Sequence, residues 1–296
     1  MITATRRGAL AGLAGSLILP PALALGQAGS PALTAREVFG QIKAASGQLW
    51  DPNPTDDRII YGDRAQLITG IATCFFSSLN VLRQAREKGL NYIVPHEASF
   101  YERYDDFAES VLADEDPVVS AKKRFLDENG MVIQRLHAHA HSRPGDAIMT
   151  GLFERLGWQS YRTEERPGIV RLPQTTAIEL GRHIKRSLGR RTLRMFGDAN
   201  KPISTVSVSG GMPGENVQIA QLEAEGVDAV MLGEVREPEV LGYAQDLSAS
   251  RPVVVYLVGH TAEDFGMLNV AQWLRTVFPG LPCEWIATPD PYTNPS

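Results

Sequence analysis

Segments with the apolar pattern of β-strands alternate with segments of helical periodicity along most of the chain. Thr34 can cap a helix over AREVFGQIKAAS, and short apolar runs such as NYIVP (91–95), DAVMLGE (228–234) and PVVVYLVGH (252–260) stand next to amphipathic stretches. This alternation builds α/β proteins in which much of the sheet is parallel. We therefore expect two intertwined three-layer α/β/α halves with largely parallel sheets.

The polar stretch SYRTEERPG (160–168) separates the two halves. We expect an N-terminal α/β half over residues 34–160 and a C-terminal α/β half over residues 168–296, interleaved as one domain. Without the first 28 residues about 268 remain, which is enough for one large or two intertwined α/β domains.

Five of the six histidines stand where a predicted strand runs into a loop. They are His96 in NYIVPHEASFY, the trio His137, His139 and His141 in RLHAHAHSRPGD, and His260 in VVVYLVGHTAEDFG; Glu97, Glu263 and Asp264 lie beside them. Ligands collect beyond the carboxyl ends of parallel strands, and imidazole with carboxylate is the ligand set of zinc, iron or manganese. We predict a metal site at the strand C-terminal ends, between the halves.

The middle cluster allows two arrangements. If the predicted strand MVIQRLHAH continues through the cluster, alternate residues share one face and all three histidines point to the metal. If the strand ends before His141, one histidine must support the ligands instead of binding, and we assign that role to His139.

Other polar residues near the predicted strand ends are weaker candidates. Glu234 follows DAVML and can act as general base or accept a hydrogen bond from a ligand, or it can cap the helix that starts near Glu237; both roles stay open. Arg143 can contact an anionic substrate. For Asp63 and Asp146 we expect loop and helix-cap roles.

Several functional classes are disfavoured. The net charge is −5, or −7 once Arg6 and Arg7 are removed (27 basic against 34 acidic residues), and no basic run is present, which argues against nucleic acid. The segment SVSGGMPGE can cradle an anion but lacks the spacing of a dinucleotide or phosphate loop. Cys74 and Cys283 allow one disulfide, although two buried thiols are the favoured expectation.

The N-terminus, MITATRRGALAGLAGSLILPPALALGQA, predicts where the protein works. Paired arginines before a short apolar run, with small residues near Ala28, are typical of a twin-arginine signal peptide over residues 1–28. Pro20 and Pro21 interrupt a run already short for a membrane span. We expect removal of this segment and a periplasmic protein without a membrane anchor, exported already folded and with its metal in place.

In these motifs the chain resembles the NIF-three-like dinuclear metal-centre proteins, homologues of a type-two GTP cyclohydrolase I. That family has a His-His pair followed three residues later by an aromatic residue; here His96-Glu97 and Phe100 stand in those places. Its middle motif, a His with an Asp four residues later, falls on His137 and His141. Imidazole and carboxylate are thus exchanged in opposite directions at the two positions, which leaves the ligand charge roughly unchanged.

The family's third motif is a His followed four residues later by Glu. Asp264 has that spacing from His260, whereas Glu263 keeps the register with Gly266, so either carboxylate can be the ligand.

The resemblance implies two divalent ions (zinc, iron or manganese), a hexameric ring and a small-molecule substrate. It leaves two functions open. One is a metal-dependent hydrolase acting on an ester, amide or phosphate, and the other is a non-catalytic metal carrier or assembly protein.

Overall fold

A computed structural model describes the chain at residues 1, 32–47, 57–102, 105 and 116–295. The predicted signal peptide, beyond its first residue, lies outside the described residues. Within them, no helix is long and apolar enough to cross a membrane.

The first sheet has five strands in the order β1-β4-β3-β2-β10. The strands of this sheet are β1 Ile59–Tyr61, β4 Val132–Gln134, β3 Tyr92–Pro95, β2 Ile71–Cys74 and β10 Cys283–Trp285. Only the edge strand β1 runs antiparallel to its neighbour; the other pairs are parallel. The C-terminal ends of β2, β3 and β4 therefore meet at one edge of the sheet.

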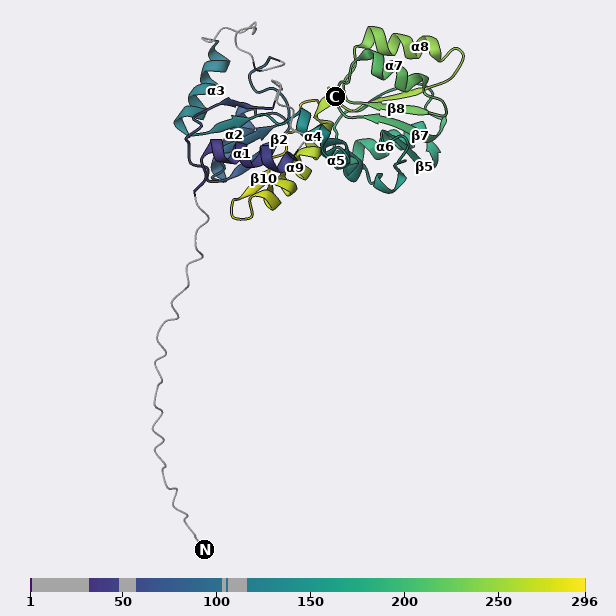
Figure 1. Cartoon of the computed structure of the whole chain (residues 1–296). Coiled ribbons are helices and arrows are strands. Elements are labelled where there is room, and N and C mark those ends of the chain that lie inside the picture. The colour runs from purple at the N-terminus through teal and green to yellow at the C-terminus, as the bar shows by residue number, and fades with distance from the viewer. Residues whose placement is uncertain (2–31, 48–56, 103–104, 106–115, 296) are drawn as a thin grey trace.

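Helices cover both faces of this sheet, as Figure 1 shows. They are α1 Ala35–Ser46 and α9 Asp264–Val277 on one face, and α2 Leu79–Glu87 and α3 Pro117–Glu128 on the other. Alternate strand residues divide between the faces: Ile71 and Tyr92 pack with α1 and α9, while Ala72 and Ile93 pack with α2 and α3. The expected three-layer arrangement is confirmed.

The second sheet has the order β5-β7-β8-β9-β6, with parallel central strands and antiparallel edges. Its strands are β5 Ile169–Thr176, β7 Pro202–Ser209, β8 Ala229–Leu232, β9 Val254–Leu257 and β6 Arg194–Phe196. One face packs on α5 Ala147–Leu156 and α6 Ala177–Ser187, and the other on α7 Glu215–Glu223, the π-helical turn Glu237–Leu241 and α8 Gly242–Leu247.

The chain crosses between the sheets more than once. After β9 it returns to the first sheet through α9 and β10, and β10 pairs with β2. In Figure 1, α4, α5 and α9 lie between the two sheets. The α5–α9 crossing is close: a Cβ on Gly151 would lie 2.4 Å from the Phe265 carbonyl oxygen, and one on Gly266 would lie 2.3 Å from Ile148 Cα. The predicted interleaving takes this form.

One predicted element is wrong in its extent. The strand expected over MVIQRLHAH ends at Gln134, and residues Ala138–Ser142 form the short helix α4. The Asp57 carboxylate accepts hydrogen bonds from the backbone N–H groups of His137, Ala138 and His139, which turns the chain into a helix. The histidines of this cluster therefore follow helical rather than strand geometry.

Both cysteines are buried free thiols, as the sequence favoured. The β2–β10 register pairs Cys283 with Ile71, three residues from Cys74 along the strand. That offset separates the two residues by about 10 Å, too far for a disulfide.

Candidate metal centre

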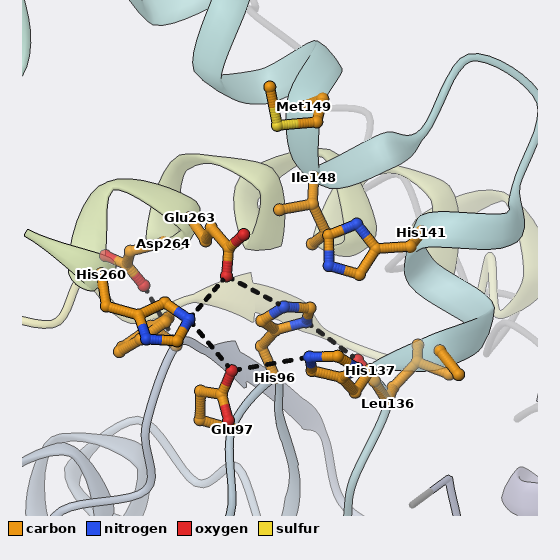
Figure 2. Close-up of polar contacts among 12 residues, drawn as sticks. His96, Glu97, Leu136, His137, His141, Ile148, Met149, His260, Glu263 and Asp264 are labelled. Carbon is orange, nitrogen blue, oxygen red and sulfur yellow. Dashed lines mark hydrogen bonds and ion pairs between the residues drawn. The ribbon is translucent and has the colours of Figure 1, made fainter. Parts of the chain in front are cut away.

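Six side chains from three segments converge between the two sheets (Figure 2). His96 and Glu97 directly follow β3, and His137 and His141 belong to the α4 turn after β4. His260 and Glu263 begin and end the 3-10 turn His260–Glu263, which joins β9 to α9. Both sheets therefore contribute, each through the C-terminal end of a parallel strand.

The distances define two overlapping sets of possible ligands. His96, His137 and His141 form one set and His96, Glu97 and Glu263 the other; within each set the ligand atoms lie within 4.8 Å of one another. His260 Nε2 lies 3.2 Å from Glu263 Oε2 and 3.4 Å from Glu97 Oε1. His96 belongs to both sets and occupies the centre of the cluster in Figure 2.

His96 has the atom that best tests whether a metal fits. Its imidazole is fully buried, and its Nδ1 lies 3.3 Å from the Leu136 carbonyl oxygen, to which it must donate. The lone pair is then on Nε2, which is buried without a hydrogen-bond partner and 3.4 Å from Glu263 Oε2. An orphaned buried nitrogen facing carboxylates is unfavourable unless a cation completes the site. The residues present therefore fit a metal ion.

The electrostatics place several of these groups in the state that binds metal. Burial raises the pKa of Glu263, but the hydrogen bond from His260 outweighs it and holds this pKa well below its usual range. Burial also raises the pKa of Glu97, but the neighbouring imidazoles of His96 and His260 lower it by more, so this pKa lies below its usual value. Burial and the neighbouring His96 lower the pKa of His137 to about 4. Ionised carboxylates and a neutral imidazole are the binding forms.

His260 and His141 behave in the opposite way. Burial lowers the pKa of His260, but the hydrogen bond to Glu263 and the charge of Glu97 raise it to about 9. The pKa of His141 is also raised, because the Asp146 carboxylate, 3.1 Å from its Nδ1, outweighs burial. A cation binding at these imidazoles would displace a proton from each.

Two residues that the sequence did not single out hold the candidate ligands in place. Arg135 is almost fully buried; its Nε donates to the His96 carbonyl oxygen and its Nη2 to Glu97 Oε2, each at 3.1 Å. Asp57 accepts the α4 amides described above and also the Nδ1–H of His139. His139 therefore lies beside Asp57, outside the ligand sets. Asp57 lies far from the histidine clusters in the sequence, and Arg135 lies directly before one of them. No local sequence pattern predicts the role of either residue.

Glu263 and Asp264 occupy different environments. Glu263 contacts His96 and His260, whereas Asp264 accepts hydrogen bonds from Phe75 N at 2.9 Å, Trp285 Nε1 at 3.1 Å and Thr288 N at 2.9 Å. Burial raises the pKa of Asp264 to about 6. Of the two carboxylates, the structure brings Glu263 into the cluster and gives Asp264 a role in joining β2, β10 and α9.

The structure also places the weaker candidates. Glu234 Oε2 accepts from His260 Nδ1 at 2.9 Å, and the helical turn at Glu237 has no side-chain cap, so Glu234 holds His260 and does not cap that turn. Asp63 Oδ1 accepts from Ala65 N in a loop, and Asp146 caps α5, as expected. The Arg143 guanidinium lies 3.8 Å from the Trp273 ring centroid, and Arg143 is not among the residues that line the cavity described next.

A cavity of about 1010 Å³ opens onto the cluster. Residues 208–215, the end of β7 and the loop that follows it, form part of its wall, so the SVSGGMPGE segment is part of the site. A Cβ on Gly211 would lie 2.6 Å from Glu263 Oε1 and 2.8 Å from His260 Nε2. Only glycine lets this backbone approach the cluster so closely.

The fold and the cluster define a two-sheet α/β protein with a candidate histidine–carboxylate metal centre between its sheets. The model of the Duf34/NIF3 (NGG1p interacting factor 3) family matches residues 58–291, most of the chain, and the chain belongs to that family. The comparison with curated protein sequences gives no match.

Solved structures share this fold at low sequence identity. A Bacillus cereus protein related to NIF3 has a TM-score of 0.70 at 14% identity and covers 90% of this chain and 100% of its own. The Staphylococcus aureus hypothetical protein SA1388 has a TM-score of 0.68 at 16% identity and covers 89% of this chain and 99% of its own. Protein ybgI, described as of unknown function, has a TM-score of 0.68 at 20% identity and covers 88% of this chain and 100% of its own. These similarities establish the fold and leave the chemistry to the residues of the site.

Proposed function

We propose that this protein is a metal-dependent hydrolase that holds two divalent ions and cleaves an ester, amide or phosphate of a small molecule. One ion would take His96, His137 and His141, and the other would take Glu97, Glu263 and His260. Zinc, iron or manganese in such a nitrogen–oxygen site supplies Lewis-acid chemistry and activates water near neutral pH.

The cavity is the observation that favours a hydrolase over a metal carrier. A carrier needs ligands and an exit path, whereas a volume of about 1010 Å³ next to the cluster provides room for a bound organic molecule. The protein's own groups have clear tasks there. Glu234 orients His260 through Nδ1, and Arg135 fixes Glu97, so both ligands present one defined atom to the site.

The central test is elemental analysis of the purified protein beside three single variants. We expect about two equivalents of metal per chain in the wild type, and loss of the ion held by His137 and His141 in His96→Ala, because this set loses its buried imidazole. His260→Ala should lose the ion held by Glu97 and Glu263. His183→Ala is the matched control, since His183 contacts the Leu156 carbonyl oxygen and Trp158, and belongs to neither set.

Turnover should then follow metal content in a screen of nitrophenyl esters, anilides and phosphates. Wild-type protein that stays empty after incubation with zinc, iron(II) and manganese would refute the metal site. Full metal loading without any turnover, together with rapid metal exchange to a chelator, would favour the carrier function instead.

We further propose that the chain is exported by the twin-arginine route to the periplasm and assembles as a hexamer. The sequence of residues 1–28 supports the first proposal, and the family resemblance supports the second. Fractionation of cells expressing the wild type and an Arg6→Lys, Arg7→Lys double variant tests export, because only the wild type should reach the periplasm. Light scattering of the purified protein tests the assembly.

A further inference from the structure

The cavity next to the cluster has five carboxylates in its wall, and each has a partner. The pairs are Glu97 with Arg135, Asp146 with His141 and the α5 amides, Glu215 with Arg236, Glu234 with His260, and Glu263 with His96 and His260. Each acidic group of the wall therefore already has a partner within the protein.

Three arginines line the same cavity, and one differs from the others. Arg135 pairs with Glu97 at 3.1 Å and Arg236 with Glu215 at 3.6 Å. Arg162 forms no ion pair with any carboxylate of the described residues. Its charge is thus the only arginine charge in the described wall of the cavity that no carboxylate balances.

Neutral neighbours hold the Arg162 side chain in position. Its Nη1 donates to Thr150 Oγ1 at 3.3 Å, and its guanidinium carbon lies 4.7 Å from the ring centroid of the buried Phe153. Its backbone forms a β-bridge with Val170 at the start of the second sheet. A half-buried guanidinium in this setting has lost part of its hydration without gaining a counter-ion, which is unfavourable until an anion arrives.

A second polar group in the wall is also unsatisfied. Ser209, at the end of β7, lines the cavity, and its Oγ is buried without a hydrogen-bond partner. A hydroxyl can donate to an anion, and guanidinium binds the two oxygens of a carboxylate or phosphate with parallel hydrogen bonds.

We propose that the substrate carries an anionic group, a carboxylate or a phosphate, and that Arg162 binds this group in the cavity. The metal cluster would then act on a bond elsewhere in the same molecule. This substrate class rests on the proposed hydrolase function, but the binding of an anion at Arg162 does not depend on turnover.

The test is calorimetric titration of the zinc-loaded full chain with monomethyl succinate, methyl phosphate and the neutral dimethyl succinate. We expect the anions to bind and the neutral ester to bind more weakly. Arg162→Met should weaken anion binding roughly 10- to 100-fold, the effect of losing a hydrogen bond to a charged group. Arg162→Lys should keep part of the affinity. Arg194→Met, which removes an exposed arginine paired with Glu237 outside the cavity, should change nothing.

The outcomes separate the two proposals. Equal anion affinity in the wild type and Arg162→Met, or no anion binding to the wild type, would overturn the role of Arg162. A folded Arg162→Lys chain that binds no better than Arg162→Met would also overturn it. The larger loss with monomethyl succinate or with methyl phosphate identifies the anion. Absence of turnover of both mono-4-nitrophenyl succinate and 4-nitrophenyl acetate, with anion binding intact, would refute the hydrolase alone.

Discussion

Replacing Asp57 by alanine should loosen α4, the turn that carries two of the candidate ligands. The Asp57 side chain is fully buried and accepts from the backbone N–H groups of His137, Ala138 and His139 and from His139 Nδ1. Loss of a helix cap costs about 1 kcal/mol. A buried donor left without a partner costs about 1–3 kcal/mol more. We therefore expect Asp57→Ala to lower the free energy of unfolding by about 2–4 kcal/mol.

The assay is urea denaturation of metal-free protein at neutral pH, followed by zinc titration of each variant. Asp57→Asn keeps one acceptor oxygen for the cap, so it should lose about half as much stability as Asp57→Ala. Zinc binding at the set with His137 and His141 should weaken in both variants, while the set with Glu97 and Glu263 keeps its ligands.

A matched control is Asp63→Ala, because Asp63 also accepts a backbone N–H but lies in an exposed loop. A destabilisation by Asp57→Ala below about 0.5 kcal/mol, the usual effect of a surface change, would refute the argument. Unchanged zinc binding in a destabilised Asp57→Ala chain would refute its second half, that the cap positions the ligands.

Two further predictions concern the wall of the site and a buried charge. Gly211→Ala should weaken zinc binding at least about tenfold, because its Cβ would meet Glu263 and His260, whereas Gly242→Ala, in open space within α8, should leave zinc binding unchanged. Lys122 is fully buried next to the rings of Phe76 and Phe100, and burial lowers its pKa from 10.5 to about 8. The unfolded chain binds more protons between these values, so the wild type should gain about 2 kcal/mol of stability relative to Lys122→Met from pH 7 to pH 9.5, measured by urea denaturation; a constant difference would contradict the lowered pKa.

The elements that the sequence predicted correctly have local signals. Thr34 and Glu37 form a capping box that starts α1, and the apolar runs around Tyr92 and Val255 become central parallel strands. The edge strands β1 and β5 were missed. They are polar or irregular, and each has a register shift against its neighbour.

The details of the site depended on contacts that no local pattern contains. His137, His139 and His141 have the alternation of a strand, but Asp57, eighty residues earlier, turns them into a helix. Glu263 lies in the cluster because a 3-10 turn follows Gly259, whose φ of 81° favours glycine. Arg162 lies in a stretch that the sequence marked only as a linker between halves, and its place in the cavity wall required the fold.

The return of the chain to the first sheet has a consequence for the order of assembly. α9 and β10 cover and complete a sheet whose other strands, β1 to β4, precede β10 by 149 (283 − 134) to 224 (283 − 59) residues, and Glu263 enters the cluster only when α9 docks. Contacts of such long sequence separation form late and slowly. During synthesis, the cluster around His96 and His137 therefore stays incomplete until the last part of the chain has been made and has docked. Metal capture by the complete cluster would then report that the whole molecule, and not one half of it, has folded.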